Sequence, residues 1–124
     1  MKIGVCGSRA YPNRPQVEWF VRNLIPKDWT IVSGACLNSP DEWAVKIAKS
    51  LGMAYIEYPA KWKNPDGSIN KRAGFERNSI IVDESDVLVA FWNGKSNGTM
   101  DTYQKAVKAG KPVWLIHPED DYSL

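Results

Sequence analysis

The segment between residues 86 and 102 carries the residue types best suited to holding an anion. Residues 87–92 are continuously apolar, as expected of a buried parallel strand, and Met100, Tyr103 and Val107 then recur at helical spacing. Between them lies a small-residue loop of Asn93, Gly94, Lys95, Ser96, Asn97, Gly98 and Thr99. A strand that turns into a helix through such a loop directs free N–H groups and the positive end of the helix dipole at one spot, which suits a phosphate. The same composition is also typical of an ordinary turn.

Two other predicted strands, at residues 2–6 and 29–32, also end in small polar turns. The residues that follow them are Gly7, Ser8 and Arg9 in the first case and Ser33 and Gly34 in the second. The planar fork of an arginine binds a phosphate or a carboxylate through two hydrogen bonds. Arg9 is therefore either a ligand contact or a surface arginine paired with Asp41 or Glu42.

Two segments that follow these turns add charged and amide side chains. Asp41 lies at a predicted helix start, where its carboxylate either accepts bonds from ribose hydroxyls or only complements the helix dipole. Arg77 and Asn78 lie on another predicted helix beside the same site. Arg77 either neutralises a phosphate or a leaving group, or is an exposed arginine paired with Glu76 or Glu84.

The chain is basic between residues 61 and 77. That segment holds five basic and two acidic residues, a net charge of +3, whereas the remainder is about −1 and the whole chain +2. Trp62 either stacks on a base or packs as part of a lid formed by residues 59–72. The cations that could contact single-stranded nucleic acid are Lys61, Lys63, Lys71 and Arg72, but the small net charge makes nucleic acid the less favoured partner.

Periodicity predicts a doubly wound α/β fold. Apolar runs at residues 2–6, 29–32, 54–58, 87–92 and 112–116 are the expected strands, and the expected helices span residues 15–25, 40–51, 73–84 and 99–108. Alternation of this kind requires a five-stranded parallel sheet, with order 3-2-1-4-5 and helices on both faces. Ligands bind such sheets where the strand order reverses, and the three polar turns converge there. The first helix should bury Val17, Phe20, Val21 and Leu24, and the tail 117–124 should pack loosely.

Bulk properties fit a globular chain of 124 residues with 44% hydrophobic and 24% charged residues. Its apolar runs are strand-sized, so we expect no membrane span, and its strand-like start leads us to expect no signal peptide. Two cysteines predict no disulfide framework, which favours a cytoplasmic setting. No spacing fits a metal site or a Walker A loop, so we expect neither a metal nor a resident cofactor. Six tryptophans predict self-association.

The chain resembles the SLOG superfamily, and more narrowly its small YspA-like, YpsA-related branch. The resemblance covers nearly the whole chain and rests on six motifs in the family's order: GSR (7–9), SGA…D (33–41), PAKW (59–62), AGFERN (73–78), SDVLVAFW (85–92) and SNGT (96–99). It implies one Rossmann-like nucleotide-binding domain over residues 1–124, with the GT turn on a phosphate. It places at the site Gly7, Ser8, Arg9, Ser33, Gly34, Asp41, Arg77, Asn78, Gly98 and Thr99.

The family's LOG phosphoribohydrolases carry P-G-G-x-G-T-x-x-E, whose glutamate works with an arginine to cleave an N-glycosidic bond. Thr102 stands at that glutamate's position and Asp101 lies one residue early, on another helix face. We therefore expect a sensor or sequestering module for a nucleotide or nucleotide derivative. The alternatives are a nucleoside monophosphate phosphoribohydrolase using Arg77 and, by likeness to the DNA-processing protein DprA, a single-stranded nucleic-acid binding module.

Overall fold

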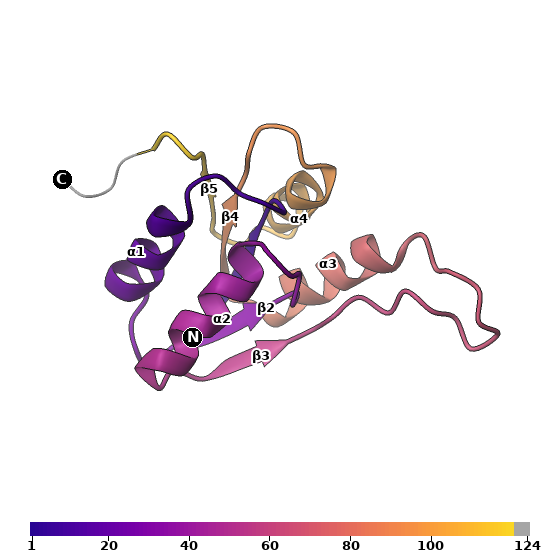
Figure 1. Cartoon of the computed structure of the whole chain (residues 1–124), viewed down its shortest axis with the longest axis horizontal. Coiled ribbons are helices and arrows are strands. Elements are labelled where there is room, and N and C mark those ends of the chain that lie inside the picture. Colours follow the sequence, from indigo (N-terminus) through magenta and orange to yellow (C-terminus); the bar gives the residue numbers. More distant parts are fainter. Residues whose placement is uncertain (121–124) are drawn as a thin grey trace.

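A computed structural model of the chain describes residues 1–120 as a parallel sheet between two pairs of helices (Figure 1). The strands are β1 (Lys2–Gly7), β2 (Thr30–Ser33), β3 (Tyr55–Glu57), β4 (Val87–Phe91) and β5 (Val113–Ile116). All neighbouring pairs are parallel and the order is β3-β2-β1-β4-β5, as the sequence predicts. Val5 of the central strand lies between Ser33 of β2 and Val89 of β4, so the order reverses at β1.

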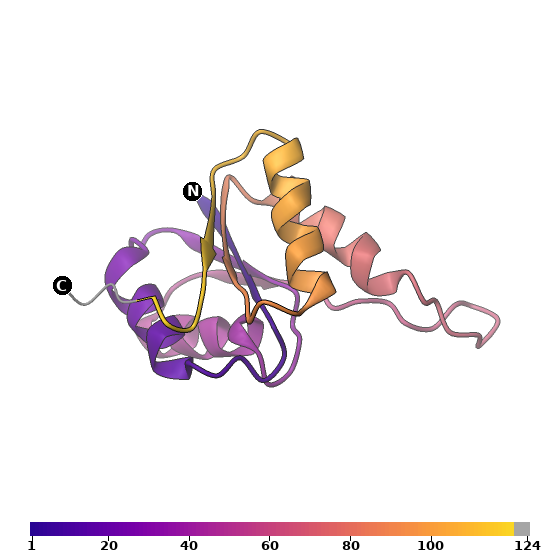
Figure 2. The same ribbon diagram turned by 90° about the horizontal axis from the view of Figure 1, so that it is seen from above.

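Two helices cover each face of the sheet. They are α1 (Arg14–Leu24) and α2 (Pro40–Leu51) on one face, and α3 (Ala73–Glu84) and α4 (Asn97–Lys108) on the other (Figure 2). Three begin with a side-chain cap: Asn13 accepts from the N–H of Gln16, Ser39 from that of Asp41, and Ser96 from that of Thr99. Such caps satisfy N–H groups that have no partner inside the helix.

The larger of two hydrophobic layers lies under α1 and α2. Phe91 is fully buried there and meets Phe20 and Tyr11 edge-on, with ring centroids 5.6 and 5.7 Å away. The second layer, under α3 and α4, is built around Leu88 and Val82. Neighbouring residues of a strand serve opposite layers, so the sheet is buried on both faces, as a parallel sheet requires.

Two predicted helix faces differ from those observed. Val17, Phe20 and Val21 are buried as predicted, but Leu24, at the last position of α1, is 48% exposed. The expected stripe of α4 is wrong: Val107 is 54% exposed, and the buried face consists of Thr99, Thr102 and Ala106. Small residues on that face let the helix lie close to α3 and the sheet. The hydroxyl of Thr102 remains satisfied because it donates to the carbonyl of Gly98 at 3.3 Å.

The chain after β5 is held against the start of α1. Gln16 donates from Nε2 to the carbonyls of His117 and Asp120, at 2.8 and 2.9 Å, and Asn13 donates from Nδ2 to that of Pro118 at 2.7 Å. The prediction of a loose tail is therefore wrong for residues 117–120, and its remaining part, 121–124, lies outside the described residues. Among residues 1–120, no helix combines the length and apolar character needed to cross a bilayer.

The end of β1 approaches the start of α2 so closely that position 7 has room only for glycine. A Cβ added at Gly7 would lie 2.3–2.8 Å from ring carbons of Pro40, whereas one added at Gly98 would meet nothing within 4 Å. We expect Gly7→Ala to lower the free energy of unfolding by about 1–3 kcal/mol, the usual cost of overpacking. Gly98→Ala, its control, should leave it unchanged or slightly raised. Urea unfolding measures both, and equal midpoints would contradict the close approach.

Candidate functional site

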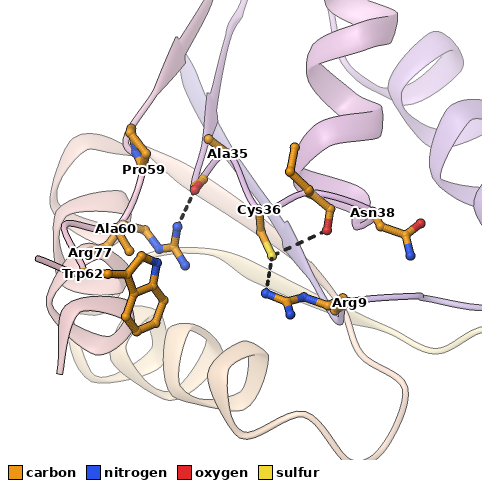
Figure 3. A pocket seen from close by; sticks show the side chains of 10 residues that line it. Arg9, Ala35, Cys36, Asn38, Pro59, Ala60, Trp62 and Arg77 are labelled. Carbon is orange, nitrogen blue, oxygen red and sulfur yellow. Dashed lines mark hydrogen bonds between the residues drawn. The ribbon is translucent and has the colours of Figure 1, made fainter. Parts of the chain in front are cut away.

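A pocket of about 530 Å³ opens at the carboxyl ends of β1, β2 and β3 (Figure 3). It is lined by Arg9, Gly34, Ala35, Cys36, Leu37, Asn38, Pro59, Ala60, Trp62 and Arg77. Arg9, Gly34, Trp62 and Arg77 are residues that the sequence places at a site. The pocket lies beside the point where the strand order reverses, which is where ligands bind in open α/β sheets.

Arg77 is fixed in its place by neutral partners. Its Nη1 donates to the carbonyl of Gly34, and its Nε donates to Oδ1 of Asn78 at 3.1 Å. Neither expected carboxylate pairs with it, since Glu76 accepts from Asn70 and Glu84 pairs with Lys2. Within residues 1–120 the guanidinium charge is therefore oriented but not neutralised by an ion pair.

Arg9 approaches the pocket from the other side (Figure 3). Within residues 1–120 its one hydrogen bond is a weak one, from Nη2 to Sγ of Cys36 at 3.9 Å. The expected pairing with a carboxylate is absent from residues 1–120, because Asp41 accepts from the backbone N–H of Gly7 and Glu42 pairs with Lys46 at 3.4 Å. Two arginines that have no ion-pair partner within residues 1–120 thus face one cavity, which is the charge pattern of an anion site.

Asp41 lies beneath the pocket rather than in its wall. It is 5% exposed, and its Oδ1 accepts from the N–H of Gly7 at 3.1 Å. Burial raises the pKa of Asp41 to about 6, against the opposing effects of the Arg77 charge and the Gly7 N–H. A Cβ at Gly34 would lie 2.8 Å from Oδ2 of Asp41 and 2.7 Å from Nη1 of Arg77, so both side chains converge on this glycine.

Ser8 joins the turn after β1 to the loop after β4. Its buried Oγ accepts from the N–H of Asn93 at 3.1 Å and lies 3.4 Å from Oγ1 of Thr99. Ser33 plays a similar part after β2, since its Oγ donates to the carbonyl of Asp41 at 3.0 Å and accepts from the N–H of Ala35. These hydroxyls, expected among ligand contacts, are used inside the protein to hold the loops.

The loop between β4 and α4 forms a second polar spot next to the pocket. Oδ1 of Asn93 accepts from the N–H groups of Lys95 and Ser96, and Gly94 has a left-handed φ of +87°. The N–H groups of Asn97 and Gly98 have no partner within residues 1–120. The predicted site residues thus lie in two places, a pocket with two arginines and the start of α4. Ser8 connects the two places.

Asn78 links these two places. Its Nδ2 donates to the carbonyl of Gly98 and to Oδ2 of Asp101, both at 3.2 Å, while its Oδ1 holds Arg77. Asp101 also pairs with Lys105 at 2.8 Å. The Asp101 carboxylate is therefore already bonded to Asn78 and Lys105. The buried Thr102 supplies no carboxylic acid at the position of the LOG glutamate.

Three positions in the pocket wall or next to it have backbone conformations that the sequence does not signal. Ala10, Ala35 and Asn38 have φ values of +55°, +58° and +54°, which non-glycine residues seldom adopt. The N–H of Ala10 donates to the carbonyl of Asn38 at 2.7 Å, so these loops support each other. Pro59 and Ala60 also escape sequence reasoning, because their place in the wall depends on the path of the chain after β3.

No family model matches the chain, but its fold is similar to those of several solved structures. The molybdenum cofactor binding protein from Rippkaea orientalis superposes with a TM-score of 0.74 at 30% identity, over 97% of this chain and 77% of that one. The Moco Carrier Protein from Chlamydomonas reinhardtii gives 0.62 at 25% identity, over 93% and 75%. The chain has a SLOG-type Rossmann-like fold.

Two further matches are partial. The SLOG-type fold is shared with DNA processing protein A from Helicobacter pylori, with a TM-score of 0.65 at 21% identity over 93% of this chain and 64% of that one. In sequence, the chain is 31% identical over 51 residues to the uncharacterized SPbeta prophage-derived protein YoqJ of Bacillus subtilis. That match spans 40% of this chain and 30% of the relative.

We expect the carboxyl group of Asp41 to make the stability of the folded chain depend on pH. Its folded pKa of about 6 exceeds the ordinary 3.8, so the folded chain retains the proton longer. The stabilisation is complete below pH 4 and is lost as the pH rises through 6, by on the order of 3 kcal/mol. We expect the free energy of unfolding to fall over this range in the wild type and to fall less in Asp41→Asn. Denaturant titrations at several pH values measure this, and parallel profiles would contradict it.

The two cysteines should differ in reactivity. Cys6 donates from Sγ to the carbonyl of Val89 at 3.7 Å, and burial raises the pKa of its thiol far above the ordinary value. Cys36 lines the pocket. We expect one fast-reacting thiol with a disulfide reagent in the folded protein and two in urea, with the Cys6 thiol at least about tenfold slower. Cys36→Ser should remove the fast phase and Cys6→Ser should keep it; the reverse pattern would disprove the assignment.

Proposed function

We propose that this chain binds a phosphate-bearing heterocyclic ligand in the pocket between Arg9 and Arg77, as a sensor, sequestering or carrier module. The observation that carries the proposal is that two arginines without ion-pair partners in residues 1–120 face a cavity of about 530 Å³. A cavity of this size accommodates a mononucleotide-sized molecule. Each guanidinium offers planar, charged donors suited to phosphate oxygens.

Trp62 supplies a surface for the ring of such a ligand. Its side chain lies in the pocket wall and remains 52% exposed, next to the backbone of Gly74. Stacking of a heterocycle on an aromatic side chain contributes about 1–3 kcal/mol. The N–H groups of Asn97 and Gly98 at the start of α4 offer a place for a second anionic group.

The structural neighbours add a cofactor to the candidate ligands. Two of them, at 30% and 25% identity, are named for binding or carrying the molybdenum cofactor. We include that cofactor with the nucleotides and nucleotide derivatives as candidate ligands. Binding without turnover is the favoured activity, because Asp101 is occupied by Asn78 and Lys105 and position 102 is a threonine.

Ligand binding should depend on both arginines. Isothermal titration with nucleoside monophosphates, ADP-ribose and the molybdenum cofactor tests the wild type against Arg9→Ala and Arg77→Ala. Loss of one charged hydrogen bond costs about 1.5–3 kcal/mol, so each variant should bind roughly 10- to 100-fold more weakly. Arg22→Ala is the matched control, since Arg22 is an exposed arginine on α1 and is not part of the pocket wall.

Three outcomes decide the proposal. Loss of binding in both pocket variants but not in the control supports it, provided that the ligand-free variants melt near the wild type. Absence of binding to every phosphate-bearing compound refutes it. Mass spectrometry of the bound ligand separates binding from hydrolysis: release of free base and ribose 5-phosphate, lost in Arg77→Ala, would make the chain a phosphoribohydrolase.

A further inference from the structure

The sheet has one protected edge and one open edge. β3, at one end, is three residues long, carries the charged Glu57 and is followed by Pro59, features that discourage pairing with another chain. β5, at the other end, pairs with no strand but β4 within residues 1–120, and its four residues are all apolar. An unprotected apolar edge strand is a template for another strand.

The backbone of β5 has the hydrogen-bonding groups that such a partner needs. The carbonyls of Pro112 and Ile116 accept from Leu88 and Trp92, which shows that even-numbered positions face β4. Because strand residues alternate in direction, the N–H and C=O groups of Val113 and Leu115 point away from the sheet. They bond to no other strand within residues 1–120.

An apolar hollow lies beside this edge, on the α1 face. Its volume is about 350 Å³, and its walls are Ile3, Phe20, Leu24, Trp29, Trp114 and Ile116, with no charged or polar side chain among them. Trp114 is 51% exposed and Leu24 is 48% exposed at its rim. Large apolar side chains around a hollow are typical of a protein–protein contact.

We propose that the open edge of β5, together with this hollow, is the interface between two copies of the chain related by a two-fold axis. Antiparallel pairing of a strand with a copy of itself is two-fold symmetric, so the Val113 and Leu115 groups of one copy meet those of the other. The two Trp114 side chains then lie on the same face of a continuous sheet, each covering the partner's hollow.

The charges that flank β5 favour this antiparallel arrangement. Lys108 and Lys111 precede the strand, whereas Glu119 and Asp120 follow it. A two-fold axis between the two β5 strands brings the basic start of one strand beside the acidic end of the other, at both ends of the interface. A parallel arrangement would place like charges together, which is unfavourable.

The test is the mass in solution, by light scattering after gel filtration. We expect about 28 kDa for the wild type, twice the 14.0 kDa of one chain. Trp114→Lys should give the monomer mass. Trp62→Lys, which alters a tryptophan of the same exposure at the other end of the sheet, should remain a dimer. Leu24→Lys repeats the test at the rim should Trp114→Lys fail to fold.

Amide exchange identifies the strand. The Leu115 N–H should exchange at least tenfold more slowly in the wild type than in Trp114→Lys, while the Trp92 N–H, bonded to Ile116 inside the sheet, should not change. A monomeric wild type, a dimer that survives the rim variants, or equal Leu115 exchange would each overturn the proposal. Because the ligand pocket lies at β1–β3, Trp114→Lys should bind ligand as the wild type does.

Discussion

The contacts of Ser8 are the constraint on which the site depends. Its N–H donates to the carbonyl of Phe91, its carbonyl accepts from Tyr11, and its Oγ accepts from Asn93 and lies beside Thr99. One buried residue thus joins the end of the central strand to the end of β4, the start of α4 and the path toward α1. The strand order reverses at this point, so the bonds of Ser8 hold together the loops that surround the pocket.

The predicted site residues fall into two groups, those whose polar atoms bond inside the protein and those whose charges face the pocket. Ser33 and Asp41 bind backbone groups and Thr99 binds the hydroxyl of Ser96, so their role is to fix loop geometry. Arg9 and Arg77 form no ion pair with a carboxylate in residues 1–120. Buried hydroxyls that hold the loops, together with arginines that face a cavity, are the basis of the proposed anion binding.

The architecture was predictable because it rests on strong local patterns. Continuous apolar runs such as 87–92 and the periodic residues of α1 and α2 specify the order of elements, and the rule of right-handed crossovers leaves few arrangements of the sheet. The inward face of α4 was missed because two of its three buried residues are threonines, which do not count as apolar, although their small size is what close packing there requires. The place of Gln16, which holds the chain after β5, depends on contacts over 100 residues apart and has no local signal.

Sequence reasoning reached the pocket only in part, for a similar reason. Arg9, Gly34, Trp62 and Arg77 follow predicted strands or belong to predicted turns and helices, so their approximate place was accessible. The left-handed conformations of Ala10 and Ala35 were not, because alanine gives no indication of a positive φ. These conformations are held by hydrogen bonds from the N–H of Ala10 to Asn38 and from the N–H of Ala35 to Ser33.

The bonds of Asn78 have a consequence for how such a site can change. Its amide accepts from Arg77 on one side and donates to Gly98 and Asp101 on the other. An aspartate could accept but not donate, a lysine could donate but not accept, and a leucine could do neither. Position 78 therefore acts as a molecular spacer that sets the separation between the pocket arginine and the start of α4. Differences in the length of the proposed ligand would then fall on other parts of the wall, such as Leu37 and Trp62, which are 73% and 52% exposed.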